Sequence, residues 1–177
     1  DPHVWFSIEN WKRVARFTAN ALILNDPANE DSYSNNLKKY LSELDSLASD
    51  IDKLIRSVSP DNRVLITAHD AFEYFGKEFG FEVIGLQGIS TVSEAGVADV
   101  RELAVLIAER RIPAIFIESS VPRRNIEALQ EAVRSRGFDV KIGGELYSDA
   151  LGSAESEAGT YIGMFRHNVY TITEALK

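Results

Sequence analysis

The sequence predicts an α/β protein: a carboxyl-terminal lobe with a four-stranded parallel sheet and flanking helices, preceded by a long helix. Two observations support this fold class. After Pro60, short β-branched runs alternate with amphipathic helical segments, which is typical of a parallel sheet with crossover helices. Before Pro60, apolar residues recur at helical spacing. With 177 residues, 45% of them apolar, the chain can bury a substantial core.

Two helices are expected before Pro60. The first covers residues 7–24 and ends before Asp26-Pro27, because proline disfavours helix at the residue that precedes it. The second, from Ser32 to Val58, has apolar steps of four and three and would be roughly 40 Å long. This spacing fits a coiled-coil seam or a rigid spine. The two apolar stripes have no sheet of their own, which suggests that a missing amino-terminal lobe or a partner chain covers them.

The remaining residues supply the sheet and its helices. The predicted strands are Arg63–Ala68, Glu82–Leu86, Pro113–Ile117 and Phe138–Ile142. Amphipathic helices lie between them, and a last helix from about Glu157 closes the domain. The glycines Gly85, Gly88 and Gly143-Gly144 match neither dinucleotide nor phosphate-loop spacing, so they are interpreted as turn glycines.

Composition excludes several classes of protein. The net charge of −8 and the absence of long basic runs argue against nucleic acid as a partner. No stretch approaches the roughly 20 apolar residues of a membrane span. The absence of cysteine excludes a disulfide framework and a thiolate metal site, which leaves histidine and carboxylate ligands. The chain opens on Asp1 without methionine, so we expect that a targeting signal is absent or lay upstream of a cut.

Ionisable side chains follow several of the predicted strands. Ligands of open α/β sheets bind at the carboxyl ends of the strands. His69 follows the first strand, Glu118 the third, and Asp149 lies beyond the fourth. A single histidine after a strand is more often a hydrogen-bonding residue than a ligand, but this grouping suits zinc, manganese or iron. His3 also has an unusual local setting, whereas His167 lies off its helix's apolar stripe and is expected at the surface.

At these residues the sequence resembles the TroA-like metal-specific solute-binding proteins of ABC importers. The resemblance spans the whole chain, and Tyr161, Met164 and Asn168 fit the family's closing pattern. The segments that carry it are Asp1-Pro2-His3-Val4-Trp5-Phe6, Thr67-Ala68-His69-Asp70-Ala71-Phe72, Gly85-Leu86-Gln87-Gly88-Ile89-Ser90-Thr91, Ile115-Phe116-Ile117-Glu118-Ser119-Ser120 and Ser148-Asp149-Ala150-Leu151-Gly152.

The resemblance implies two lobes joined by one long helix, with a metal held between them. Residues 1–31 would then be the remnant of an amino-terminal lobe, 32–59 the linking helix and 60–177 the metal-binding carboxyl-terminal lobe. The implied ligands are His3, His69 and Asp149. A fourth ligand, a histidine, would come from the missing amino-terminal lobe. Three histidines and one aspartate favour zinc (Zn), with manganese (Mn) and iron as further candidates.

Glu118 resembles the family's glutamate at a strand end. We interpret it as an outer partner that orients an imidazole, with direct ligation as the alternative. The implied function is capture of the metal by coordination and delivery to the membrane permease of an ABC transporter, without catalytic turnover. The implied location is periplasmic or extracytoplasmic, with a membrane anchor through the missing amino-terminus.

Two other functions are consistent with the residues. A zinc metallohydrolase would use His3, His69 and Asp149 as ligands, an open position for water and Glu118 as general base. A scaffold or adhesion protein would pair chains through the long helix and would need no metal.

Overall fold

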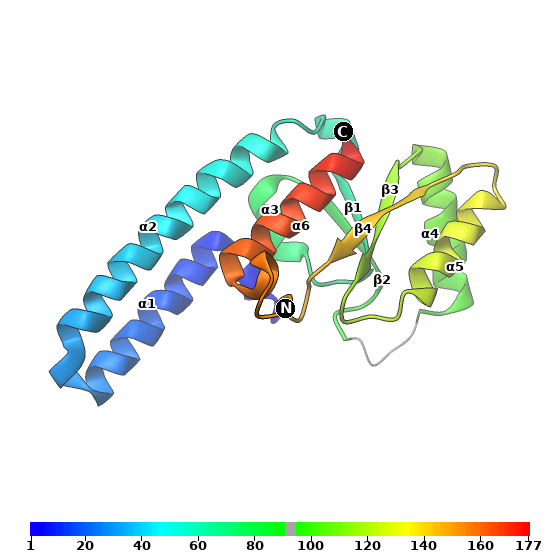
Figure 1. The fold of residues 1–177 in the computed structure, drawn as a ribbon. Coiled ribbons are helices and arrows are strands. Elements are labelled where there is room, and N and C mark those ends of the chain that lie inside the picture. Colours follow the sequence, from blue (N-terminus) through cyan, green and yellow to red (C-terminus); the bar gives the residue numbers. More distant parts are fainter. Residues whose placement is uncertain (91–94) are drawn as a thin grey trace.

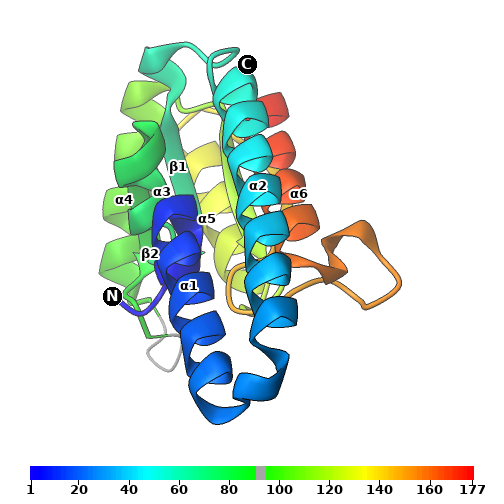
Figure 2. The same ribbon diagram turned by 90° about the vertical axis from the view of Figure 1, so that its left-hand side faces the viewer.

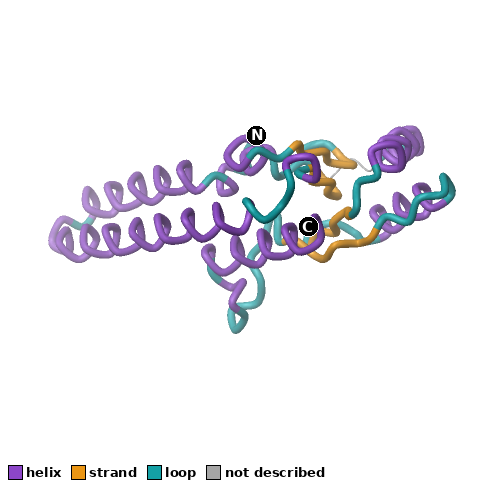
Figure 3. The backbone as a smooth tube through the Cα atoms, turned by 90° about the horizontal axis from the view of Figure 1, so that it is seen from above, coloured by secondary structure: helices purple, strands orange, loops and turns teal. Residues whose placement is uncertain are grey.

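A computed structural model describes residues 1–90 and 95–177, so Thr91, the last residue of one resemblance segment, lies outside the described part. Two antiparallel helices, α1 (Ile8–Asn25) and α2 (Glu30–Ile55), extend as a hairpin from an α/β body (Figure 1; Figure 2). Seen from above, the hairpin reaches far beyond the strands (Figure 3). No helix in the described residues is both long and apolar enough to cross a bilayer.

Both helices predicted before Pro60 are present. Ser7 caps α1, because its Oγ accepts a hydrogen bond from the Asn10 backbone N–H at 3.1 Å. Helix α2 ends at Ile55 and not at the expected Val58. Its last turn tightens there, because the N–H groups of Ser57 and Val58 donate to carbonyls only three residues back.

The inner half of α2 packs on its own chain. Leu44, Leu47 and Ile51 are fully buried, in a cluster that also contains Phe165 and Val169 of α6 (Tyr161–Leu176). Helices α2 and α6 are in direct contact. This part of the apolar stripe therefore has an intramolecular partner, and a coiled-coil dimer is not needed to bury it.

The four strands form two parallel pairs instead of the single four-stranded sheet that was predicted. Strand β1 (Val64–His69) pairs with β2 (Glu82–Gln87), and β3 (Ala114–Glu118) pairs with β4 (Lys141–Leu146). Strands β1 and β3 lie against each other, but no ladder joins them among the described residues. Ile115 pairs with Ile142 and Phe116 with Gly144, so the pairing skips Gly143 of β4, and an extra residue of this kind bends its strand locally.

Strand β4 lies further along the chain than the predicted Phe138–Ile142, and it contains the supposed turn glycines Gly143 and Gly144. Their role is close packing. A Cβ added to Gly143 would lie 2.6 Å from Cε1 of Phe116 and 2.7 Å from Cβ of Ala175 in α6. Gly144 has a φ of +143°, which other residues rarely adopt. The glycines thus allow α6 to lie directly on β4.

The remaining helices are α3 (Glu73–Phe79), α4 (Val97–Arg110) and α5 (Arg124–Arg134). Two apolar clusters flank the strands. One joins the strands to α4 and α5, and the other joins them to α2, α3 and α6. The second cluster also includes Phe6 and Ile8, and the ring of Phe6 stacks on that of Phe72 at 4.2 Å. The amino-terminal segment therefore shares a core with the α/β body, which places it beside the strand ends.

The packing of Gly143 yields a test of stability. We expect Gly143→Ala to lower the free energy of unfolding by about 1–3 kcal/mol, because the added methyl overpacks the contact between β4 and α6. Urea denaturation measures this change. Gly88→Ala is the matched control, since a Cβ there would have no neighbour within 4 Å. Equal stability of the two variants would contradict the packing role.

Candidate metal centre

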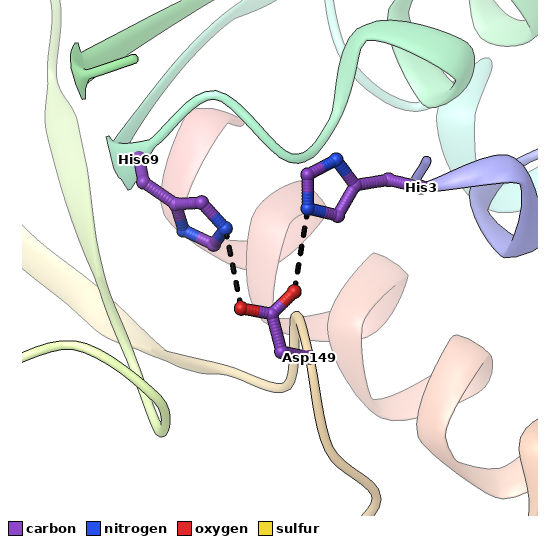
Figure 4. Close-up of side chains that lie close together, drawn as sticks. All are labelled: His3, His69 and Asp149. Carbon is purple, nitrogen blue, oxygen red and sulfur yellow. Dashed lines mark ion pairs between the residues drawn. The ribbon is translucent and has the colours of Figure 1, made fainter. Parts of the chain in front are cut away.

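Three predicted site residues meet at the carboxyl ends of the strands (Figure 4). Nε2 of His3 lies 3.3 Å from Oδ1 of Asp149, and Nε2 of His69 lies 3.4 Å from Oδ2 of the same carboxylate. One ligand atom from each residue lies within 4.8 Å of the other two. Both imidazoles are buried, whereas the Asp149 side chain is 35% exposed. Solvent therefore reaches the cluster from the side of Asp149.

His69 is the last residue of β1, a strand buried along its whole length. The hydroxyl of Thr67 donates to the His69 carbonyl at 2.8 Å. Gly85 of β2, predicted as a turn glycine, lies within the strand under the segment that follows His69. A Cβ there would lie 2.5 Å from the backbone nitrogen of Asp70. The chain can leave β1 in this direction only because residue 85 has no side chain.

Glu118 contacts the His69 imidazole at the Nδ1 edge of the ring, away from the cluster at Nε2. Its Oε2 lies 2.6 Å from His69 Nδ1, and its Oε1 accepts the His69 backbone N–H at 2.8 Å. This contact is an ion pair whenever the imidazole carries its second proton. A carboxylate at Nδ1 favours the tautomer with its proton there, which leaves the Nε2 lone pair facing Asp149.

His3 has a carboxylate partner that the sequence analysis did not identify. Oδ1 of Asp1 lies 2.6 Å from His3 Nδ1 and accepts the His3 backbone N–H at 3.0 Å. Asp1 thus repeats at His3 the arrangement that Glu118 makes at His69. The available signal was a carboxylate two positions before a histidine, a spacing too common to single out.

The two imidazoles differ in their electrostatic surroundings. Burial lowers the pKa of His3, although the Asp149 carboxylate acts in the opposite direction. Burial also acts to lower the pKa of His69, but the carboxylates of Glu118, Asp149 and Asp70 together outweigh it, and the net shift is upward. His3 therefore stays neutral to lower pH, and His69 is the first of the two to take up a proton.

The donor set suits a divalent transition metal. Nε2 of His69 is buried and has no hydrogen-bond partner within residues 1–90 and 95–177. A buried polar atom without a partner carries a desolvation cost, and a metal ion would remove it. Two imidazole nitrogens with one carboxylate match the ligands of zinc, manganese and iron. In the described part of the chain, these three residues are the one group of this kind.

His167 is exposed and lies elsewhere, with Nε2 3.0 Å from the Glu145 carbonyl oxygen.

A long helix on an α/β lobe, with two imidazoles and a carboxylate at its strand ends, is the arrangement that the resemblance to the TroA-like metal receptors implies. The chain belongs to the family described as zinc-uptake complex component A, periplasmic, which matches residues 1–175. The resemblance found in the sequence is confirmed.

Individual relatives agree with this assignment. The zinc-binding protein TroA of Treponema pallidum (strain Nichols) is 48% identical over 176 residues, which are 99% of this chain and 57% of that protein. The manganese-binding lipoprotein MntA of Bacillus subtilis (strain 168) is 48% identical over 177 residues, 100% of this chain and 58% of that protein. The solved structure of the periplasmic TroA from Treponema pallidum matches with a TM-score of 0.97 at 48% identity, over 99% of this chain and 64% of that one. The chain thus spans little more than half the length of these curated relatives.

The opposite pKa shifts of the two histidines can be checked in metal-free protein. We expect the His69 ring to titrate at higher pH than the His3 ring, and Glu118→Gln to move the pKa of His69 downward because burial then dominates. Histidine-selective NMR measures both, and His69→Ala assigns the signals. Titration of His3 above His69 would contradict the electrostatic description.

Proposed function

We propose that this chain is the carboxyl-terminal part of an extracytoplasmic receptor that captures zinc or manganese and delivers it to an ABC transporter permease. The observation that carries the proposal is the convergence of two buried Nε2 atoms on Asp149, with His69 Nε2 lacking any other partner in the described residues. Relatives named as zinc-binding and manganese-binding proteins support it. A Streptococcus anginosus relative, 27% identical, is named as a manganese ABC transporter substrate-binding lipoprotein.

The ligand roles form part of this proposal. His3, His69 and Asp149 bind the metal directly, and Glu118 orients His69. A further histidine from the rest of the receptor completes the site on the exposed side of Asp149. Three imidazoles and one carboxylate favour zinc, while the carboxylate also admits manganese. Overall similarity does not separate the two metals, because the zinc-binding and manganese-binding relatives share the same identity of 48%.

We also propose the division into residues 1–31 from a first lobe, 32–59 as linking helix and 60–177 as the second lobe. In support, the outer part of α1 exposes Phe17 (77%) and Leu24 (82%). A groove of about 480 Å³ between α1 and α2 has an apolar lining that includes Val14, Leu22 and Leu37. Apolar surface of this kind is usually covered, and the relatives are long enough to include a further lobe.

The geometry argues against the metallohydrolase. A general base must reach the water bound to the metal. Glu118 contacts Nδ1 of His69, on the opposite side of the ring from Nε2 and Asp149. The family is likewise one of metal uptake.

Substitution of the proposed ligands tests the site. We expect His69→Ala and Asp149→Ala each to weaken zinc binding by on the order of 100-fold or more, beyond the loss typical of an outer partner. Calorimetric titration and metal analysis of the purified chain give the two readouts. His167→Ala is the control, because this histidine is exposed and outside the cluster. Unchanged zinc affinity in both ligand variants would refute the site.

Protons compete with the metal for the imidazoles. We expect zinc affinity to fall as the pH drops through the ordinary histidine range near about 6.5. Because the pKa of His69 is raised, His69 is the first ligand to be protonated as the pH falls. The decline in zinc affinity therefore begins on the alkaline side of that range. Equilibrium dialysis with zinc at a series of pH values measures the effect. Binding that stayed equally tight well below this range would exclude imidazole ligation.

A further inference from the structure

We propose that Trp5 is a positioning residue that limits the separation of His3 and Asp149 and thereby slows release of the metal. This inference rests on the proposed function. Its indole Nε1–H donates to the backbone carbonyl of Ser148, the residue before Asp149, at 2.9 Å. The same ring lies against the His3 imidazole, with centroids 5.2 Å apart and planes at 75°. One side chain thus contacts the segments of two proposed ligands.

The elements at both ends of this link are themselves held in place. The hydroxyl of Tyr161, the first residue of α6, donates to the Trp5 carbonyl at 2.8 Å. At the other end, Ser148 is 2% exposed, and its hydroxyl lies 2.8 Å from that of Ser120. The Trp5–Ser148 hydrogen bond therefore joins two anchored segments, so stretching it would strain both.

A second residue, Asn168, also holds the loop that carries Asp149, and comparison with it shows how the hydrogen bond of Trp5 differs. The amide of Asn168 in α6 accepts the Tyr147 N–H at 2.9 Å and donates to the Tyr147 carbonyl at 2.7 Å. Asn168 thus orders the loop from within the carboxyl-terminal lobe. Trp5 instead comes from the segment that carries His3, so its hydrogen bond constrains the distance between the ligands.

This constraint matters because the backbones of the three proposed ligands are held unequally. His69 belongs to a buried strand and is fixed by Glu118. His3 and Asp149 lie outside helices and strands. When a metal leaves, these two are the ligands whose backbone segments can move apart, and the Trp5–Ser148 bond must break if they do. Loss of one neutral hydrogen bond corresponds to about a fivefold change in an equilibrium or rate constant.

Trp5→Phe removes the indole N–H and keeps an aromatic ring. We expect zinc release into excess chelator, followed by stopped flow, to become about fivefold faster, with little change in the association rate. Trp11→Phe is the matched control: its indole N–H also donates a 2.9 Å hydrogen bond, to Tyr40, and both indoles are half-buried. Release from this control should equal that of the unsubstituted chain.

Two further readouts separate positioning from general destabilisation. Cobalt(II) bound in place of zinc should show a shifted visible absorption spectrum in Trp5→Phe and not in Trp11→Phe, because the spectrum reports the ligand geometry. Thermal unfolding of the metal-free variants tests for a shared loss of stability. Should Trp5→Phe fail to fold, Tyr161→Phe removes the hydroxyl that holds the Trp5 carbonyl and should accelerate release in the same direction.

The outcomes are distinguishable. Equal release rates and equal cobalt spectra for the Trp5 and Trp11 variants would overturn this inference and leave the proposed function intact. Failure of the unsubstituted chain to bind zinc or cobalt would overturn both together. Faster release with a shifted spectrum in Trp5→Phe alone would support it.

Discussion

The buried contact between His69 and Glu118 is the interaction on which the site depends. Both side chains are 0% exposed, and a buried ionisable pair has a desolvation cost that only close contacts offset. Glu118 makes two such contacts, one with Nδ1 of the ring and one with the backbone N–H of His69. Because one carboxylate holds both the ring and the backbone of the same residue, the direction of Nε2 has little freedom.

The same contact joins the two strand pairs. Strands β1 and β3 lie side by side without a shared ladder in the described residues. At their carboxyl ends, the N–H of His69 in β1 donates to the Glu118 side chain of β3. A side-chain oxygen thus takes the place that a neighbouring carbonyl holds in a continuous sheet. Any shift of one strand pair against the other would displace the His69 imidazole, so the fold and the site are coupled at this point.

The sequence predicted which site residues lie close together where those residues follow the predicted strands. His69 and Asp149 could be placed together because the carboxyl ends of parallel strands meet at one edge. His3 precedes every strand, so strand order could not place it beside the other two; its local setting was unusual, but its role as a ligand came from the family resemblance. The role of Trp5 depends on a hydrogen bond to a residue 143 positions away, which no local pattern encodes. The position of strand β4 was predicted wrongly, because Gly143 was taken for a turn residue, whereas it allows close packing against Phe116.

Helix α2 shows why periodicity predicts a buried face without identifying its partner. One apolar stripe runs along the helix. Its inner residues, among them Leu44 and Ile51, are 0% exposed against α6, whereas its outer residues, among them Leu37 and Tyr40, line the groove beside α1. A spacing of three and four residues is the same in both halves, since it reflects only the geometry of the helix. What covers each half depends on distant segments: α6 for the inner half, and for the outer half, on our proposal, a second lobe. The apolar spacing of a helix therefore cannot distinguish a coiled coil from an inter-lobe spine until the positions of the neighbouring elements are known.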